Sequence, residues 1–493
     1  MEGPARDSRI GSDSGAVGAS TSRPICVDMD GTLLRTDSLV ECCAALLRRS
    51  PWKIIQVPFW LLRGRAFLKR QLASQAPVDV DGLPCHDELL DYLRNEANAG
   101  RRIILATGAD ASIGEQVAAR FGIFHEVLAS DGTLNLTGKR KAALLVERYG
   151  RGGFDYAGNS NADLAVWREA RGRIVVSSSS GLERRVRELG GALTTFKGSG
   201  NIASGVFRAL RMHQWAKNAL LFVPVLAGHR LTDRSILFQV FFAVVAFCLC
   251  ASSVYVANDL HDLESDRDHP LKRFRPFASG QVPLIIGFGL VPMLAFAGLL
   301  CGIACPPQFL VYLGLYLFIS TAYSWALKQV VLLDVFVLAG LYTLRILAGH
   351  GATGIPYSSW LLGFSMFLFL SLALLKRYIE LRRLASQGTE RASGRDYQAG
   401  DAPGIYSLGA ASGYLAILVL ALYINSEDVR LLYRQPLLLL FICPLLLYWV
   451  SRIWVLAARG QIDDDPVLFA LKDKVSYLVG GIACFFVWLA TVL

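Results

Sequence analysis

The sequence has few charged residues for its length. Asp, Glu, Lys and Arg make up 18% of the 493 residues, whereas 53% are hydrophobic. Average soluble domains carry about 25% charged residues, so this composition indicates a membrane protein rather than a soluble enzyme. The charged residues are unevenly distributed. Up to about residue 200 the composition is that of a soluble domain, and long apolar runs dominate after it.

Metal-ligand spacing is missing among the ten cysteines, and most of them lie in apolar runs. We interpret them as small hydrophobic residues in a reducing compartment, not as disulfides or ligands. Residues 1–22 lack an apolar core, which predicts a disordered tail and no signal peptide. The net charge of +10 requires no nucleic acid, because bases can serve at membrane ends or around phosphates.

One polar stretch, residues 258–280, interrupts the apolar half. Asp259, Asp262 and Asp266 recur at helical spacing, so a helix here would place three carboxylates on one face. Such carboxylates repel one another at the mouth of a membrane helix, and a bound divalent cation removes that penalty. Oxygen ligands without cysteine suit Mg²⁺ or Mn²⁺. The alternative is a solvated, charged loop.

The stretch resembles the first signature of the UbiA superfamily of intramembrane prenyltransferases, Asn-Asp-x-x-Asp-x-x-x-Asp. The match falls on Asn258, Asp259, Asp262 and Asp266. The resemblance implies that these side chains hold Mg²⁺ against a diphosphate that departs during group transfer, with Asp262 as a catalytic residue. It also implies an all-α transmembrane domain.

The N-terminal half contains a second pattern of chemistry-bearing residues. A short apolar strand runs into Asp28-Met-Asp30-Gly-Thr, and a second apolar strand ends at Thr107. A carboxylate at the end of a strand, followed by another two residues on, can act as nucleophile and general acid beside a cation. Lys141 opens a helical segment, and a further short strand precedes Gly158-Asn159.

In order and spacing, these motifs resemble the four motifs of the haloacid dehalogenase superfamily of phosphohydrolases, which have a Rossmann-like parallel α/β sheet. The resemblance implies that Asp28 is the nucleophile, Asp30 the acid/base, Thr107 a phosphate ligand and Lys141 the neutralising charge. It further implies that Asp28, Asp30 and Asn159 hold Mg²⁺.

Two features of this half leave alternatives open. Lys139 is a substitute candidate for the role of Lys141. The fourth motif has Asn159 where the superfamily usually has Asp, although Asp163 keeps a carboxylate nearby. An active phosphatase with weakened metal binding is therefore one reading, and a decayed or purely structural domain is the other.

Residues 38–100 stand where the superfamily inserts a helical cap. Within them, residues 52–70 mix aromatic side chains with bases. This composition suits a segment that lies on an anionic membrane surface, and equally a cap helix packed on the core.

The membrane half contains nine apolar stretches that are long enough, or nearly so, to cross a bilayer. We therefore predict a disordered tail over 1–22, a phosphatase domain over 23–200 and a nine-helix UbiA-like domain over 201–493. Lys and Arg are concentrated on one side, which predicts an integral, multi-pass protein of the cytoplasmic membrane with both sites on the cytoplasmic side. The stretches are 212–228, 235–257, 282–304, 308–327, 331–349, 358–378, 407–426, 435–456 and 474–493.

Polar residues at the predicted cytoplasmic ends of these helices, or within them, are candidates for substrate binding. Some of them have a simpler explanation as snorkelling membrane anchors. Asp334 and Arg345 are harder to explain in that way, because a charge within the membrane is costly without a partner. The candidates are Lys217, Asn218, Lys272, Arg273, Arg275, Tyr323, Lys328, Arg345, Lys376 and Arg377.

Many UbiA-type prenyltransferases have a second Asp-x-x-x-Asp motif, but this chain has Lys376-Arg377-x-x-Glu380 instead. Three further motifs resemble those of the polyprenyl-phosphate phosphoribosyltransferase branch: Trp215-x-Lys-Asn, Asp266-Arg-x-His-Pro-x-Lys with Arg275-Pro, and Tyr323-Ser-x-x-Leu-Lys followed by Asp334. The resemblance implies phosphoribosyl pyrophosphate and a polyprenyl phosphate lipid as substrates. The alternatives are transfer of an isoprenyl group to an aromatic or small acceptor, and a transporter or structural membrane protein. Whether the chain forms a homo-oligomer stays open.

Overall fold

The computed structural model describes residues 23–133, 135–177, 179–388, 395–462, 466–470 and 472–493. The chain forms two compact units. The first comprises the N-terminal part up to Leu210 together with Val256–Leu290, and the second comprises Arg211–Tyr255 and Val291–Leu493. The Asp-rich stretch therefore packs within the N-terminal unit. The tail predicted over residues 1–22 lies outside the described residues.

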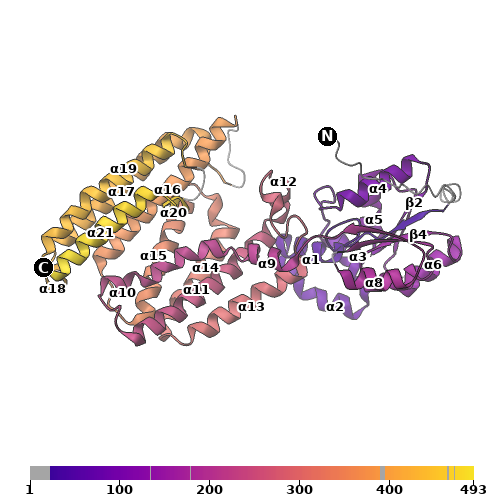
Figure 1. Ribbon diagram of the computed structural model, residues 1–493, viewed down its shortest axis with the longest axis horizontal. Coiled ribbons are helices and arrows are strands. Elements are labelled where there is room, and N and C mark those ends of the chain that lie inside the picture. Colours follow the sequence, from indigo (N-terminus) through magenta and orange to yellow (C-terminus); the bar gives the residue numbers. More distant parts are fainter. Residues whose placement is uncertain (1–22, 134, 178, 389–394, 463–465, 471) are drawn as a thin grey trace, which may run out of the picture. The chain divides into compact units, whose positions relative to one another are not determined.

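A six-stranded parallel sheet forms the centre of the first unit, with the strand order β3-β2-β1-β4-β5-β6 (Figure 1). This confirms the predicted Rossmann-like α/β fold. β1 pairs with both β2 and β4, so the ends of these three strands lie side by side. The strands are β1 (Ile25–Val27), β2 (Ile103–Asp110), β3 (Glu126–Ser130), β4 (Asp155–Gly158), β5 (Gly172–Ser177) and β6 (Ala192–Lys197).

Both faces of the sheet are covered, which explains why its central strands are apolar without alternation. Ile25 and Val27 point into one core and Cys26 into the other. Helices α1 (Ser38–Arg49), α3 (Arg65–Gln75), α4 (Asp87–Asn98) and α5 (Ala111–Phe121) supply the first core. The second core is supplied by α6 (Lys139–Tyr149), α7 (Leu164–Trp167) and α8 (Ser180–Glu188).

Shorter elements complete the first unit. The predicted cap contains η1 (Pro51–Gln56) and α2 (Val57–Leu62) ahead of α3. η2 (Asn161–Asp163) follows β4, and α9 (Ile202–Ala209) follows β6. The Asp-rich stretch contributes α12 (Leu263–Asp268) and η4 (Lys272–Phe274).

Among the residues that the structure describes, seven helices are long and apolar enough to cross a membrane. Two of them, α11 (Arg234–His261) and α13 (Leu284–Gly302), run from one unit into the other. The others are α15 (Leu333–Thr353), α16 (Ser359–Ser386), α17 (Ala402–Ile424, with η6 Ala399–Asp401 before it), α19 (Ile442–Ala458, with η7 Pro436–Phe441) and α21 (Lys474–Val492).

The prediction of nine spans is not confirmed. The first predicted span, 212–228, forms η3 (Met212–Phe222) and the short α10 (Val223–Ala227) instead of one long α-helix, and it is not among the seven. The stretch 308–327 does form a helix, α14 (Pro307–Trp325), but α14 is not among the seven spans. The remaining short elements are η5 (Leu327–Gln329), α18 (Glu427–Leu432) and α20 (Pro466–Ala470).

Candidate active sites

The predicted phosphatase residues meet at the carboxyl edge of the sheet. Asp28 directly follows β1, Thr107 lies near the end of β2, and Asn159 directly follows β4. Because β1 lies between the other two strands, these residues are brought together although they are far apart in the sequence. A cavity of about 1050 Å³ is lined by Asp28, Asp30 and Asn159.

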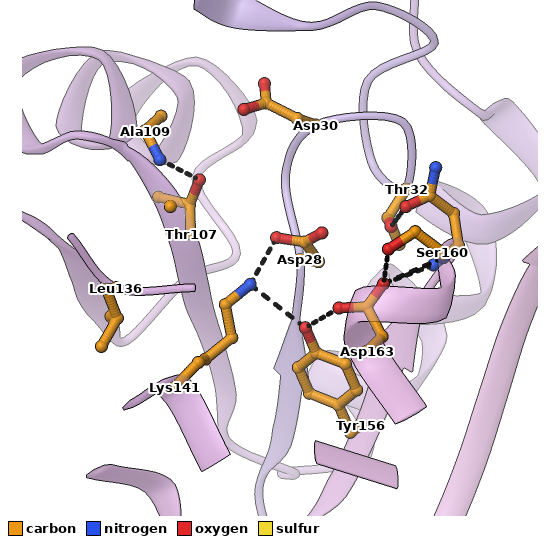
Figure 2. Close-up of polar contacts among 12 residues, drawn as sticks. Asp28, Asp30, Thr32, Thr107, Ala109, Leu136, Lys141, Tyr156, Ser160 and Asp163 are labelled. Atoms are coloured by element: carbon orange, nitrogen blue, oxygen red, sulfur yellow. Dashed lines mark hydrogen bonds and ion pairs between the residues drawn. The ribbon is translucent and has the colours of Figure 1, made fainter. Parts of the chain in front are cut away.

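Lys141, and not Lys139, is the cation at this site. Its Nζ donates to Asp28 Oδ1 at 2.7 Å and to Tyr156 Oη at 3.2 Å. Tyr156 Oη in turn donates to Asp163 Oδ1 at 2.8 Å (Figure 2). Asp163 also accepts from Ser160 N at 3.0 Å and Ser160 Oγ at 2.8 Å. This buried chain of hydrogen bonds orients the ammonium group against Asp28.

Asp30 is held by the start of α1. Its oxygens accept from Ser38 N at 2.9 Å and from Ser38 Oγ at 3.0 Å. Burial, together with the nearby charge of Asp37, raises the pKa of Asp30 to about 7. Burial also raises the pKa of Asp28 to about 6, against the opposing effect of Lys141. A carboxyl group with a raised pKa is suited to donating a proton near neutral pH, the role expected of Asp30.

Thr107 is fully buried, and its Oγ1 accepts a hydrogen bond from Ala109 N at 3.0 Å. The hydroxyl proton of Thr107 can then be donated to a phosphate oxygen. Asn159 Oδ1 accepts from Thr32 Oγ1 at 3.3 Å. A Cβ added to Gly31 would lie 2.1 Å from Asn159 Nδ2, and Gly31 has φ +74°, so only glycine leaves room for this amide. Asp28, Asp30 and Asn159 fit the oxygen donor set of a Mg²⁺ site.

Sequence reasoning missed three residues of this site. Ser38 holds Asp30, and Tyr156 links Lys141 to Asp163. Lys69 of α3 donates to Gly108 O at 2.6 Å, next to Thr107. Burial lowers the pKa of Lys69, and the negative charge of Asp30 acts in the opposite direction. The mixed aromatic and basic composition of residues 52–70 was the only sequence signal for Lys69.

The Asp-rich stretch is helical but not one helix. α11 ends at His261 and α12 begins at Leu263, with Asp262 between them in a non-helical conformation (φ −90°, ψ 14°). Asp262 N and Asp266 N nevertheless donate to Asn258 O and Asp262 O, each at 2.8 Å, as in a helix, and the shared face of three carboxylates stays a prediction. Asp262 Oδ1 lies 3.0 Å from His261 Nδ1.

Asp259 and Asp266 are brought together around a guanidinium group. Arg275 Nη1 donates to Asp266 Oδ2 at 2.6 Å and to Asp259 Oδ1 at 3.3 Å. Burial raises the pKa of Asp266, and Arg275 lowers it. In the described part of the chain, no group of three or more His, Cys, Asp or Glu side chains is arranged to hold a metal ion. Two carboxylates that already converge on a cation nevertheless fit a Mg²⁺ ligand pair.

The same stretch is tied to the α/β domain by buried charges. Arg267 Nη2 donates to Glu41 Oε1 of α1 at 2.5 Å, and both side chains are less than a tenth exposed. Thr36 Oγ1 donates to the same Glu41 oxygen at 2.7 Å. Arg48 Nη2 donates to Glu264 Oε1 at 2.7 Å. Lys272 and Arg273 of η4 are exposed, and Asn258 is half-buried.

The second unit contains two buried polar clusters that include predicted substrate residues. In the first, Arg345 Nε donates to Asn218 Oδ1 at 3.0 Å, and the guanidinium carbon lies 4.9 Å from the ring centroid of Tyr316. Lys217 Nζ lies 5.6 Å from the ring centroid of Tyr342, which Arg345 also approaches. The charge of Arg345 is thus held by polar and aromatic neighbours, Asn218 and Tyr316.

In the second cluster, Asp334 is fully buried and pairs with Arg377. Tyr397 Oη donates to Asp334 Oδ1 at 2.6 Å, and Arg377 also pairs with Glu380. These two carboxylates compensate the buried charge of Arg377, and substrate binding by Arg377 stays a prediction. Tyr323 and Lys328 are half-buried near the end of α14 and in η5, and Lys376 is exposed on α16.

The chain thus combines a parallel α/β domain, which has a cluster of aspartates at one sheet edge, with long apolar helices and an Asp-rich loop. The chain belongs to the UbiA prenyltransferase family, whose sequence profile matches residues 220–472. Residues 25–168 match the haloacid dehalogenase-like hydrolases.

Individual proteins resemble both parts of the chain. An uncharacterized protein of Sinorhizobium fredii is 38% identical over 463 residues, which cover 93% of this chain and 89% of the relative. The decaprenyl-phosphate phosphoribosyltransferase of Mycolicibacterium smegmatis is 31% identical and covers 59% of this chain, with 92% of its own length matched. A UbiA homolog from Archaeoglobus fulgidus, solved with GPP and Mg²⁺, covers 57% of this chain and matches over 96% of its own, with TM-score 0.44 and 16% identity.

Proposed function

We propose that this chain transfers 5-phosphoribose from phosphoribosyl pyrophosphate to a polyprenyl phosphate, and that its N-terminal domain then removes the 5′-phosphate. The product would be polyprenyl-phosphoryl ribose. The similarity to a decaprenyl-phosphate phosphoribosyltransferase supports the first reaction. The intact Asp28–Lys141 site supports the second.

One observation carries the link between the two reactions. The cavity that contains Asp28 and Asp30 is also lined by residues at the end of the Asp-rich stretch and the start of α13, namely Gly280, Gln281, Pro283, Leu284 and Ile285. A lipid headgroup released from the loop would therefore lie near the phosphatase residues. Tethering the second enzyme to the first raises its effective concentration for the shared intermediate.

In the transfer step, an oxygen of the lipid phosphate attacks the anomeric carbon of phosphoribose. The bond from that carbon to pyrophosphate breaks, and pyrophosphate leaves with the electron pair. Arg275 lies between Asp259 and Asp266, where it can bind the departing phosphates, and the exposed Lys272 and Arg273 add positive charge. We also propose that further residues contribute to substrate binding or transfer: Asp262, Lys217, Asn218, Tyr323, Lys328 and Lys376.

In the phosphatase step, Asp28 attacks phosphorus while Asp30 protonates the departing 5′ oxygen of ribose. Water, deprotonated by Asp30, then cleaves the aspartyl-phosphate and releases inorganic phosphate. Lys141 balances the negative charge at Asp28, and Thr107 donates to a phosphate oxygen. Mg²⁺, held by Asp28, Asp30 and Asn159 in this domain and by Asp259 and Asp266 in the loop, would supply electrostatic stabilisation of the phosphates when bound.

The test uses the purified full chain with Mg²⁺, polyprenyl phosphate and phosphoribosyl pyrophosphate labelled in the ribose. We expect label in the extracted lipid and release of inorganic phosphate by the wild type. Asp28→Asn should accumulate the phosphorylated lipid without releasing inorganic phosphate. Identical products from both proteins would refute the phosphatase step.

A parallel incubation tests the alternative chemistry. It contains a labelled isoprenyl diphosphate and an aromatic acceptor in place of the phosphoribosyl donor. If label moves to the acceptor, and no label from phosphoribosyl pyrophosphate enters the lipid, the chain is an isoprenyl transferase and the proposal is wrong. Both active sites are expected on the cytoplasmic side, which protease accessibility of the N-terminal domain in oriented vesicles would check.

A further inference from the structure

The cap exposes a row of large apolar side chains. Trp52 is 68% exposed, Ile55 69%, Phe59 64% and Leu62 84%. Their spacing of three, four and three residues places them on one face of the helical segment formed by η1 and α2. We call these four residues the cap face. Contiguous exposed apolar surface of this kind marks an interaction site rather than an ordinary solvated surface.

The opposite side of the same segment packs inward. Ile54, Val57 and Trp60 are partly buried against the core that also contains α3. α3 is anchored by the buried Leu68 and Leu72. The segment therefore has two apolar faces, and the core of the domain buries one of them. Packing on the core and contact with a membrane surface, the two alternatives for residues 52–70, are thus compatible.

The charge of this segment has one sign. Residues 51–75 contain five bases and no acidic residue. Arg63 and Arg65, which follow the cap face directly, are exposed. An apolar helical face bordered by bases matches the surface of an anionic bilayer, where apolar side chains enter the acyl boundary and bases meet the phosphates.

We propose that the cap face is an interfacial anchor that holds the α/β domain on the surface of an anionic lipid bilayer. Seven candidate membrane spans lie in the described part of the chain, so the protein works in a bilayer to which such an anchor could bind. Such an anchor would present the phosphatase cavity to lipid-bound substrates. The inference depends on the cap surface alone and holds whether or not the proposed reactions are correct.

The experiment places the photoreactive residue p-benzoylphenylalanine at position 62 of the full chain. The protein is reconstituted in liposomes of phosphatidylcholine with one quarter phosphatidylglycerol, the latter radiolabelled, and irradiated. We expect labelled lipid attached to the chain at position 62. The control position is Asp91 on α4, whose side chain is 70% exposed and which is not part of the cap face. The photoreactive residue at this position should acquire little lipid.

Charge variants test the second half of the proposal. Arg63→Gln with Arg65→Gln should lower the yield of phosphatidylglycerol adduct at position 62 several-fold, while Arg94→Gln on α4 should leave it unchanged. Absence of lipid adduct at position 62, or adduct with a second copy of the chain instead, would overturn the proposal. Equal adduct yields in the Arg63/Arg65 variant and the parent would overturn the role assigned to the bases.

Discussion

The two candidate sites differ in how their charged groups are held. At the phosphatase site, Asp28 and Asn159 follow adjacent strands whose backbone hydrogen bonds fix their separation. In the Asp-rich loop, Asp259 and Asp266 lie on either side of a helix break, and the side chain of Arg275 pairs with both. A sheet edge thus positions its catalytic groups through the backbone, whereas the loop depends on side-chain contacts.

A second contrast concerns the support behind each site. Lys141 and Asp163 belong to the same α/β fold as Asp28. The loop is instead supported from outside the membrane helices, by the ion pair of Arg267 with Glu41 of α1. The phosphatase site should therefore tolerate changes in the loop, whereas the transferase site should be sensitive to changes in the α/β domain.

The largest expected effect separates the two chemistries. Asp28→Asn removes the proposed nucleophile and should lower phosphatase turnover by about 10⁴-fold. Asp262→Asn should abolish transfer and leave hydrolysis of added phosphorylated lipid intact. The rates of lipid labelling and phosphate release measure the two steps separately. Lys139→Ala is the matched control and should change neither rate, because Lys141 makes the contact with Asp28.

The next effect tests the external support of the loop. Glu41→Gln leaves Arg267 buried without its charge partner, which should destabilise the first unit by about 3–5 kcal/mol. Transfer should fall with it, and thermal unfolding of the purified chain gives the stability change. Asp91→Asn, which alters an exposed pair with Arg94, is the control.

A double variant sharpens this prediction. Glu41→Leu with Arg267→Met removes both charges, so it should be less destabilising than the sum of the two single changes. Additive losses would show that the pair does not couple α1 to the loop. Full transfer activity in Glu41→Gln would show that the loop holds its own geometry.

A smaller effect is expected for the cap residue that reaches the phosphatase site. Lys69→Met removes a charged hydrogen-bond donor next to Gly108 and should raise the KM for the phosphate substrate by at least tenfold. The turnover number should change little, because Lys141 stays in place. Arg70→Gln, an exposed neighbour, should leave KM unchanged. An equal rise in both variants would assign the effect to net charge.

The smallest effect concerns the unusual fourth motif. Asn159→Asp adds a carboxylate oxygen to the proposed Mg²⁺ donors and should lower the Mg²⁺ concentration for half-maximal hydrolysis about fivefold, on the order of 1 kcal/mol. Asn161→Asp, at an exposed position of η2, is the control. An unchanged Mg²⁺ dependence would mean that position 159 does not contact the metal.

Much of the α/β domain could be predicted because its motifs occur at strand ends. Asp28, Thr107 and Asn159 were expected at one edge, and a parallel order with β1 between β2 and β4 brings them there. Ser38 and Tyr156 could not be predicted, because ordinary residues gain their roles only from three-dimensional contacts.

In the membrane half, apolar composition alone did not decide whether a segment forms one long helix. The stretch 212–228 is apolar enough to resemble a span, yet it forms 3₁₀ turns and the short α10. Arg377 was expected to bind substrate because it is a base near a helix end. The structure pairs it with Asp334, 43 positions earlier, a partner that no local pattern could reveal.

By itself, the sequence determined the two-part organisation, the phosphatase motifs and the apolar character of the second half, because each follows from local composition or spacing. Only the tertiary structure decided that Arg275 joins Asp259 to Asp266, that Glu41 holds Arg267, and that the cap keeps one apolar face exposed. The physical reason is that charge pairing and burial depend on neighbours distant in the chain. Periodicity identifies a face of a helix, and packing decides what that face contacts.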